Sequence, residues 1–282
     1  FVWFNNCCFK LLNLNEDQTI NALGLVSTRA SGIKSQFGTM GKPFHAGMAA
    51  SNGIEAAKLS KLGFVSKEDG IECEQGFFLT HGWDKKIPPR AIENLGTDFL
   101  FPEIKYKFHA CCHGLHSFLE ALDEMKLENN FNPETIEEIA IETNPSWLKV
   151  CNIEEPKTGL ESKFSYKLTA AMSIYGKDTS NLDTYSDEIC FDDNLNNIRD
   201  KVRVIPNDNL SNTQSLISIK DGSSNVKNKH DLSDKIENNI LETKIVNKSV
   251  SLLSETKSNQ ISKILNAPNE NKVDALVDCL VS

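Results

Sequence analysis

The sequence predicts an α+β multidomain fold, in which a partial all-helical domain is followed by a smaller α+β domain. Residues 9–103 show almost no strand pattern, and their apolar residues recur at helical spacing instead. Residues 104–230 alternate short strand-like runs with amphipathic stripes, which is typical of an α+β domain. We therefore expect a helical domain over 1–103, an α+β domain over 104–229, and C-terminal helices over 230–282 that return to the helical domain.

Length and composition limit the classes of function. The 282 residues suffice for one large domain or two small ones. Hydrophobic residues make up 39% of the chain and charged residues 24%, as in an ordinary soluble globular protein. The net charge of −9 argues against a nucleic-acid partner, which requires a basic face, and against docking on anionic membranes. The eight cysteines lack a regular spacing, which favours a reduced, cytoplasmic protein over a disulfide scaffold.

In the N-terminal half, the first expected helix starts after Asn15. This residue can cap it, and the acidic Glu16 and Asp17 in its first turn suit the helix dipole. The helix is expected to end at residues 31–32. Shorter helical pieces are expected at 64–69 and 76–79, and a further one that begins at Pro88-Pro89.

The stretch 37–57 predicts a flexible loop followed by a buried helix. Gly38 and Gly41 leave the backbone unrestricted, and Pro43 disfavours a helical conformation at the residue before it. Small residues then recur at helical spacing and let another helix approach closely: Ala46, Ala49, Ala50, Gly53 and Ala57. Gly63 is expected to end this helix.

Two side chains lie where this loop enters the helix. Lys42 and His45 can both carry positive charge, and the start of a helix favours a bound anion. We expect them to hold a carboxylate. The alternative is that Lys42 is a solvated loop lysine and that His45 caps the helix.

From residue 104 onward, strands and helices alternate. A short strand-like segment over 104–109 precedes a helix with a strong apolar stripe formed by Leu115, Phe118, Leu119, Leu122 and Met125. The remaining expected elements are an edge-like strand at 137–143, a turn at 145–147, helices at 160–174 and from 192, strands at 202–206 and 216–219 with a hairpin turn at Asp221-Gly222, and helices near 240–252 and 271–281.

One cluster of potential metal ligands lies at the start of the second domain: His109, Cys111, Cys112, His113 and His116. Histidine and cysteine are good zinc ligands, but two adjacent cysteines cannot easily share one tetrahedral ion. No second pair lies at the usual offset, and no C-x-x-C run suggests an iron–sulfur cluster. We expect no metal and no other cofactor.

Three blocks of sequence resemble signature segments of the MmgE/PrpD family, the group of 2-methylcitrate dehydratase and cis-aconitate decarboxylase. They are Gly-Thr-Met-Gly-Lys-Pro-Phe-His-Ala-Gly from Gly38, Tyr-Lys-Phe-His-Ala-Cys-Cys-His-Gly-Leu-His from Tyr106, and Glu-Pro-Lys-Thr-Gly-Leu-Glu-Ser-Lys-Phe-Ser from Glu155. Their order matches that of the family, and the resemblance covers most of residues 9–205.

The resemblance implies a hydro-lyase that acts without metal on a small di- or tricarboxylic acid, most like 2-methylcitrate dehydratase of propionate catabolism. Decarboxylation or epimerisation of a related acid is a sister possibility, because such a scaffold supports varied chemistry. The resemblance also implies a homodimer, and a site between the helical domain and the smaller domain, which acts as a lid.

Carried onto this sequence, the resemblance makes Lys42 and Lys107 the catalytic residues, because fixed cations stabilise the negative charge of the transition state. It makes His45, His116 and Tyr166 residues that bind the substrate. The alternatives are that Lys107 is a solvated lysine and that His116 packs its helix. The tyrosine of the lid also has a less direct match, since residues 167 or 168 are alternatives to Tyr166.

The beginning of the chain departs from the family pattern. It starts at Phe1 without an initiator Met, and the expected acid–base Asp and His would lie before it. We therefore expect an N-terminally truncated fragment. The alternative function is a catalytically inactive remnant that serves only as a folded or interaction module.

Overall fold

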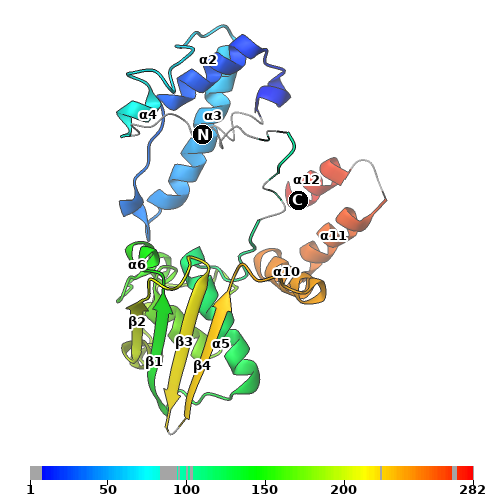
Figure 1. The fold of residues 1–282 in the computed structure, drawn as a ribbon. Helices are drawn as coiled ribbons and strands as arrows, with labels where there is room; N and C mark the ends of the chain where they lie inside the picture. The colour runs from blue at the N-terminus through cyan, green and yellow to red at the C-terminus, as the bar shows by residue number, and fades with distance from the viewer. Residues whose placement is uncertain are drawn as a thin grey trace. The chain divides into compact units, whose positions relative to one another are not determined.

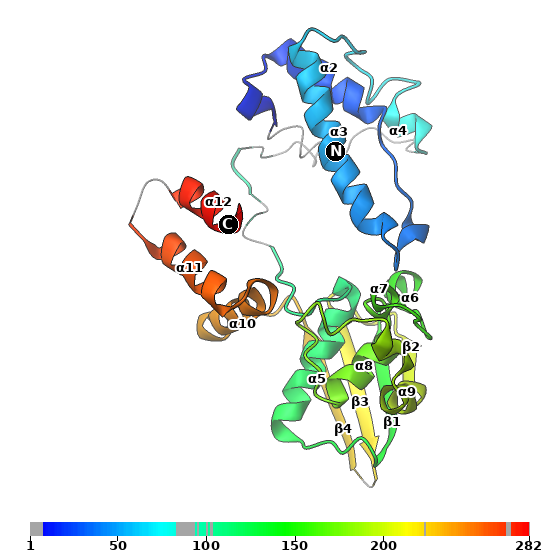
Figure 2. The same ribbon diagram turned by 180° about the vertical axis from the view of Figure 1, so that it is seen from behind.

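The computed structural model describes residues 8–82, 94, 96–99, 101, 104–222, 224–268 and 272–281 (Figures 1 and 2). The chain divides into two compact units, an N-terminal unit over Phe1–Ile104 and a C-terminal unit over Lys105–Ser282. Helices combine with one small mixed sheet, which confirms the α+β multidomain fold. The expected domain bounds and the return of residues 230–282 to the helical domain stay predictions.

The described part of the N-terminal unit consists of helices and turns. Its elements are α2 (Glu16–Ser27), the short 3-10 turn η1 (Lys34–Gln36), α3 (Gly41–Lys61) and α4 (Phe77–Thr80). Asn15 accepts a hydrogen bond from the backbone N–H of Gln18 at 2.9 Å, and the Gln18 side chain accepts one from the Asn15 N–H at 3.1 Å. This reciprocal capping box confirms the predicted start of the first helix. Helix α2 packs against α3, with Ala22 and Ala57 in their shared core.

Helix α3 starts earlier than the sequence pattern predicts. Lys42 lies in its first turn and not in a loop, because proline is tolerated there, where the backbone N–H has no helical partner to lose. Gly63 has a φ of +90° directly after the helix, as predicted. The helical piece expected at 64–69 is wrong, since this segment is irregular and ends in a turn. The helix expected from Pro88-Pro89 lies outside the described residues.

The C-terminal unit contains a four-stranded sheet in the order β2-β1-β3-β4. Its strands are β1 (Ile136–Thr143), β2 (Val202–Pro206), β3 (Gln214–Asp221) and β4 (Ser224–Asp231). Strand β1 pairs parallel with β2 and antiparallel with β3, which pairs antiparallel with β4. The prediction of an edge strand at 137–143 is therefore wrong, because β2 covers the side of β1 that β3 leaves free. Figure 1 shows β1 within the sheet.

Helices α5 (His116–Glu128), α8 (Tyr166–Ile174) and α9 (Asp193–Asp200) lie on one face of this sheet, as Figure 2 shows. The predicted apolar stripe of α5 is buried, with Phe118, Leu119 and Leu122 fully enclosed. The inward residues of the central strands, among them Ile141 and Ile217, complete the core. This core fixes the start of α5, where the candidate site lies.

The expected helix over 160–174 is divided in two: α7 (Gly159–Ser162) and α8. Thr158 caps the first and Ser165 the second, and each hydroxyl accepts a backbone N–H bond. The expected turn at 145–147 is a helix, α6 (Pro145–Cys151), which is capped by Asn144. The segment 104–109, expected to be strand-like, is irregular.

The C-terminal helices are α10 (Asn238–Leu253), α11 (Glu255–Asn266) and α12 (Lys272–Val281). The first and third confirm the expected helices near 240–252 and 271–281. Across the described residues, the structure holds no helix with the length and apolar character that a membrane span requires.

Candidate active site

The turn over residues 109–115 is held between two loops of the C-terminal unit. The Ala110 N–H donates to the Thr179 carbonyl, and the Cys112 N–H donates to the Lys163 carbonyl, each at 2.8 Å. The residues that follow form a 3-10 turn, η4 (His113–Leu115), that leads directly into α5. The start of α5 is thereby surrounded by segments that lie far apart in the sequence.

A buried histidine–carboxylate pair lies inside this turn. The Nδ1 of His109 contacts the Thr179 hydroxyl at 2.7 Å, and its Nε2 lies 3.3 Å from Oε1 of Glu120. The latter two atoms form an ion-pair contact without the alignment of a hydrogen bond. The other oxygen of Glu120 forms an ion pair with Lys244 of α10. Burial alone would raise the pKa of Glu120, but His109 and Lys244 outweigh it and lower this pKa to about 2.

His116, the first residue of α5, is buried beside this pair. Its ring centroid lies 5.2 Å from that of His109 and 5.5 Å from that of His113. Burial, helped by the charges of His109 and Lys107, lowers the pKa of His116 to about 2. The imidazole of His116 is therefore neutral at physiological pH and can accept or donate a proton in a hydrogen bond.

Two buried cysteines, Cys111 in the turn and Cys151 in α6, are poor nucleophiles. Burial raises the pKa of Cys111 to about 12, so its sulfur stays protonated. The pKa of Cys151 is also raised, first by its contact with Cys112 and then by burial. Within the described ranges, no three His, Cys, Asp or Glu side chains gather as metal ligands would.

The predicted site residues of the C-terminal unit lie around this turn. Lys107 is exposed, and its charge acts on both His113 and His116. Tyr166 is fully buried: its hydroxyl donates to the Gly114 carbonyl at 2.7 Å and lies 3.1 Å from the Thr143 hydroxyl. Lys107 thus lies within electrostatic range of His116, and Tyr166 supports the turn from the protein interior.

The two predicted residues of the N-terminal unit lie in the first two turns of α3. The Lys42 ammonium lies 5.2 Å from the centroid of the Phe37 ring. The His45 ring packs against Gly32, and its Nε2 is buried without a hydrogen-bond partner among the described residues. Because this pair belongs to the other unit, the roles predicted for Lys42 and His45 stay predictions.

Sequence reasoning missed Glu120 and Thr179 and gave His109 no role. A signal for Glu120 existed, since it is a charged residue next to an apolar stripe and one helical turn after His116. No comparable signal marks Thr179, because only the fold brings it to His109.

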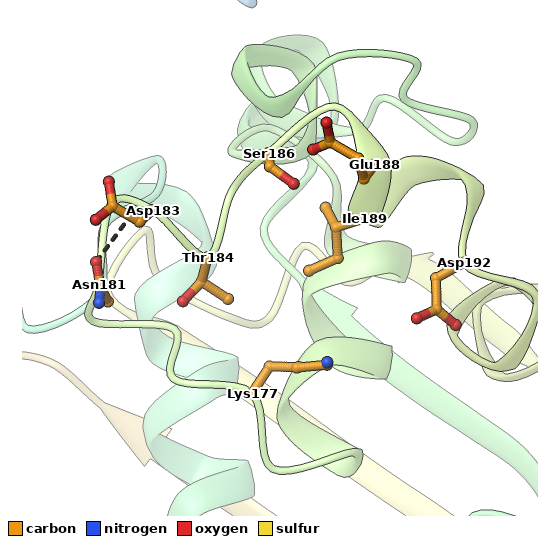
Figure 3. Close-up of a pocket in the computed structure, with 8 residues that line it drawn as sticks. All are labelled: Lys177, Asn181, Asp183, Thr184, Ser186, Glu188, Ile189 and Asp192. Atoms are coloured by element: carbon orange, nitrogen blue, oxygen red, sulfur yellow. Dashed lines mark hydrogen bonds between the residues drawn. The ribbon is translucent and has the colours of Figure 1, made fainter.

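A hollow of about 490 Å³ lies elsewhere in the C-terminal unit, along the segment over residues 177–192. Figure 3 shows Asp183, Glu188 and Asp192 around it with Lys177, and the Asp183 N–H donates to Asn181 at 2.9 Å. Three carboxylates would repel an acidic substrate. The turn over 109–115 is therefore the better candidate for a site that receives carboxylates.

The fold and the site define a two-unit α+β protein whose second unit gathers buried imidazoles, a buried carboxylate and lysines around one turn. Residues 7–89 match the MmgE/PrpD N-terminal domain, and residues 109–267 match the MmgE/PrpD C-terminal domain. The chain belongs to the MmgE/PrpD family, as the three resembling blocks predict.

Named relatives lie within the same family. The chain is 28% identical over 201 residues to cis-aconitate decarboxylase of Aspergillus terreus, which covers 66% of the chain and 40% of the relative. It is 33% identical over 129 residues to cis-aconitate decarboxylase-like protein oryM of Aspergillus oryzae, covering 43% of the chain and 26% of the relative. It is 35% identical over 84 residues to human cis-aconitate decarboxylase, covering 29% and 18%. The matched region is less than half of each relative.

Proposed function

We propose that this chain takes part in a lyase reaction on a small di- or tricarboxylic acid. The observation that carries this proposal is that the exposed Lys107 acts electrostatically on the neutral, buried His116, in a chain of this family. The names of the relatives favour decarboxylation of cis-aconitate. Dehydration of 2-methylcitrate, the reaction expected from the resemblance, is the second candidate.

Both reactions place the same demand on the site. Loss of CO2 or of a proton leaves an electron pair next to a remaining carboxylate, and the Lys107 ammonium would stabilise this charge most strongly in the transition state. The neutral imidazole of His116 would bind the substrate through a hydrogen bond, as the resemblance implies, and the proton would be carried by another group. In this proposal, Lys42 and His45 hold a carboxylate of the substrate.

The proposal includes two properties that the resemblance implies, catalysis without a metal and a homodimer, and a cytoplasmic location, which the cysteine pattern favours. A role in carboxylic acid metabolism such as propionate catabolism belongs to it as well. Direct contact of Tyr166 with the substrate is its least supported part, since two protein groups already engage the hydroxyl of Tyr166.

The test is turnover of each acid by the purified chain, followed by NMR so that CO2 loss and water loss are told apart. Lys107→Met should lower kcat/KM at least ~100-fold, because the transition state loses a charge partner. Lys105→Met, which removes a nearby exposed ammonium, is the matched control and should change it less than about twofold. A chelator should leave the rate unchanged.

Absence of turnover by the folded chain with both acids would overturn the proposal in favour of an inactive interaction module. That alternative has one structural observation in its favour. Met40 and Phe44, at the start of α3, are exposed in the N-terminal unit, where an interaction partner would cover them.

A further inference from the structure

Two lysines that neither the family resemblance nor the relatives assign to a site converge on the turn over residues 109–115. Lys163 lies in the loop between α7 and α8, and its backbone carbonyl binds the Cys112 N–H at 2.8 Å. Lys248 projects from α10, and its ammonium donates to the Ser180 carbonyl at 2.5 Å. Ser180 directly follows Thr179, whose carbonyl binds the Ala110 N–H.

The side chain of Tyr185 holds this arrangement together. Its hydroxyl donates to the Thr179 carbonyl at 3.0 Å, and the Lys163 ammonium lies 5.6 Å from the centroid of its ring. On the other side, Ser251 of α10 reaches the Ser180 carbonyl at 3.4 Å, beside Lys248. Both lysines are therefore fixed to the same loop by contacts that do not involve a carboxylate.

Lys107, Lys163 and Lys248 are here called the basic cluster, and the charges of the first two act on the third. Burial lowers the pKa of Lys163, and burial together with the charges of Lys107 and Lys163 lowers that of Lys248. None of the three ammonium groups forms an ion pair with a carboxylate among the described residues. Asp178 acts on Lys248 electrostatically, but from beyond ion-pair distance.

Such an arrangement has an energetic cost. The partly buried Lys163 and Lys248 lose hydration, and Lys248 is also repelled by the charges of Lys107 and Lys163 without a carboxylate at ion-pair distance to offset the loss. The net charge of −9 means that carboxylates outnumber basic side chains in this chain. Even so, none of the described carboxylates lies at ion-pair distance from the basic cluster. A bound anion would recover the missing interaction.

We propose that Lys163 and Lys248 form, with Lys107, a binding site for a ligand with two or more carboxylates, and that they set the preference for a polycarboxylate over a monocarboxylate. The three ammonium groups come from three separate elements. A ligand with several carboxylates can contact all of them, whereas a single carboxylate can contact only one or two of these ammonium groups. The inference rests on the proposed function for the identity of the substrate, but the binding site does not require turnover.

The test is calorimetric titration of the intact chain with citrate, which serves as a stable polycarboxylate, and with acetate and inorganic phosphate. We expect saturable binding of citrate and none of acetate at the same concentration. Lys163→Met and Lys248→Met should each raise the Kd for citrate about tenfold, the loss of one charge-assisted hydrogen bond. Lys248→Arg should keep binding close to the original, which separates loss of charge from loss of folding.

Lys263→Met, which removes an exposed ammonium from α11, is the matched control and should leave the Kd unchanged. Equal Kd values for Lys248→Met and the unchanged chain would overturn the proposal, as would binding of phosphate as tight as that of citrate. Citrate binding that depends on Lys248, in a chain without turnover, would refute the proposed function alone. Unchanged turnover in both Lys163→Met and Lys248→Met would refute this inference and leave the proposed function standing.

Discussion

The carboxylate of Glu120 on α5 and the ammonium of Lys244 on α10, 124 positions apart in the sequence, form an ion pair in the C-terminal unit. The Glu120 side chain is 5% exposed and that of Lys244 33%. Lys244 also lies 5.0 Å from the centroid of the Phe108 ring. The pair thus ties α10 to the helix that starts at the candidate site.

Removal of the Lys244 ammonium should lower the free energy of unfolding. Lys244→Met leaves the buried Glu120 carboxylate without its lysine partner, and we expect a loss of roughly 3 kcal/mol in the free energy of unfolding of the C-terminal unit. Urea unfolding measures this loss. Lys220→Met, which breaks an exposed pair with Glu137, is the control and should cost less than ~1 kcal/mol. Similar losses for both variants would contradict a buried role for Glu120.

His116 should remain neutral in mildly acidic solution. Burial lowers its pKa from the usual 6.5 to about 2, so folding favours the neutral ring. The resulting stability is complete above pH 6.5 and is lost progressively as the pH falls toward 2, because the unfolded chain takes up a proton. Imidazole ¹⁵N NMR at pH 5, assigned with His116→Gln, should show a neutral ring. A transition near pH 6 at this residue would refute the prediction.

Loss of the Tyr166 hydroxyl should lower the stability of the fold more than it affects catalysis. In Tyr166→Phe the Gly114 carbonyl and the Thr143 hydroxyl lose a buried partner, and we expect a loss of about 1–3 kcal/mol in unfolding free energy. Tyr106→Phe, at an exposed position, should have almost no effect. If Tyr166 instead contacts the substrate, kcat/KM of Tyr166→Phe will fall even at temperatures where the variant is fully folded. This result would support the substrate-binding role that the resemblance implies.

Gly32 should tolerate no side chain. Its φ is +99°, and a Cβ would lie 3.0 Å from the His45 ring, so Gly32→Ala combines backbone strain with displacement of that ring. We expect a loss of about 1–3 kcal/mol in the stability of the N-terminal unit. Gly47→Ala is the matched control, since nothing lies within 4 Å of its Cβ and alanine favours the helix. Equal melting temperatures of the two variants would contradict this account.

Local sequence patterns predicted most of the helices and strands, but not the contacts that these elements make with one another. The stripe along α5 and the hairpin turn at Asp221-Gly222 follow from periodicity and turn chemistry, which neighbouring residues set. The position of β1 in the sheet and the start of α3 were predicted wrongly. Sheet order depends on distant pairing, and the early start of α3 reflects a proline that the first turn tolerates.

The candidate site also combines residues that could be predicted from the sequence with partners that could not. Lys107 and His116 could be named from the sequence, because they lie nine positions apart in one block that resembles a motif of the family. The partners Thr179 and Lys244 could not, since no local signal relates a loop threonine to the distant His109 or a tail lysine to the distant Glu120. Electrostatic partners at long range are visible only once the chain is folded.

The central place of β1 has a consequence for the order of folding. Strands β3 and β4 are joined by a tight turn and can pair early, because closing a short loop costs little chain entropy. The parallel pairing of β1 with β2 requires the whole crossover through α6, α7, α8 and α9 to be in place. We therefore expect closure of this crossover to be the slow step in forming the C-terminal unit. The same closure brings the loops of Lys163 and Thr179 to the turn that precedes α5.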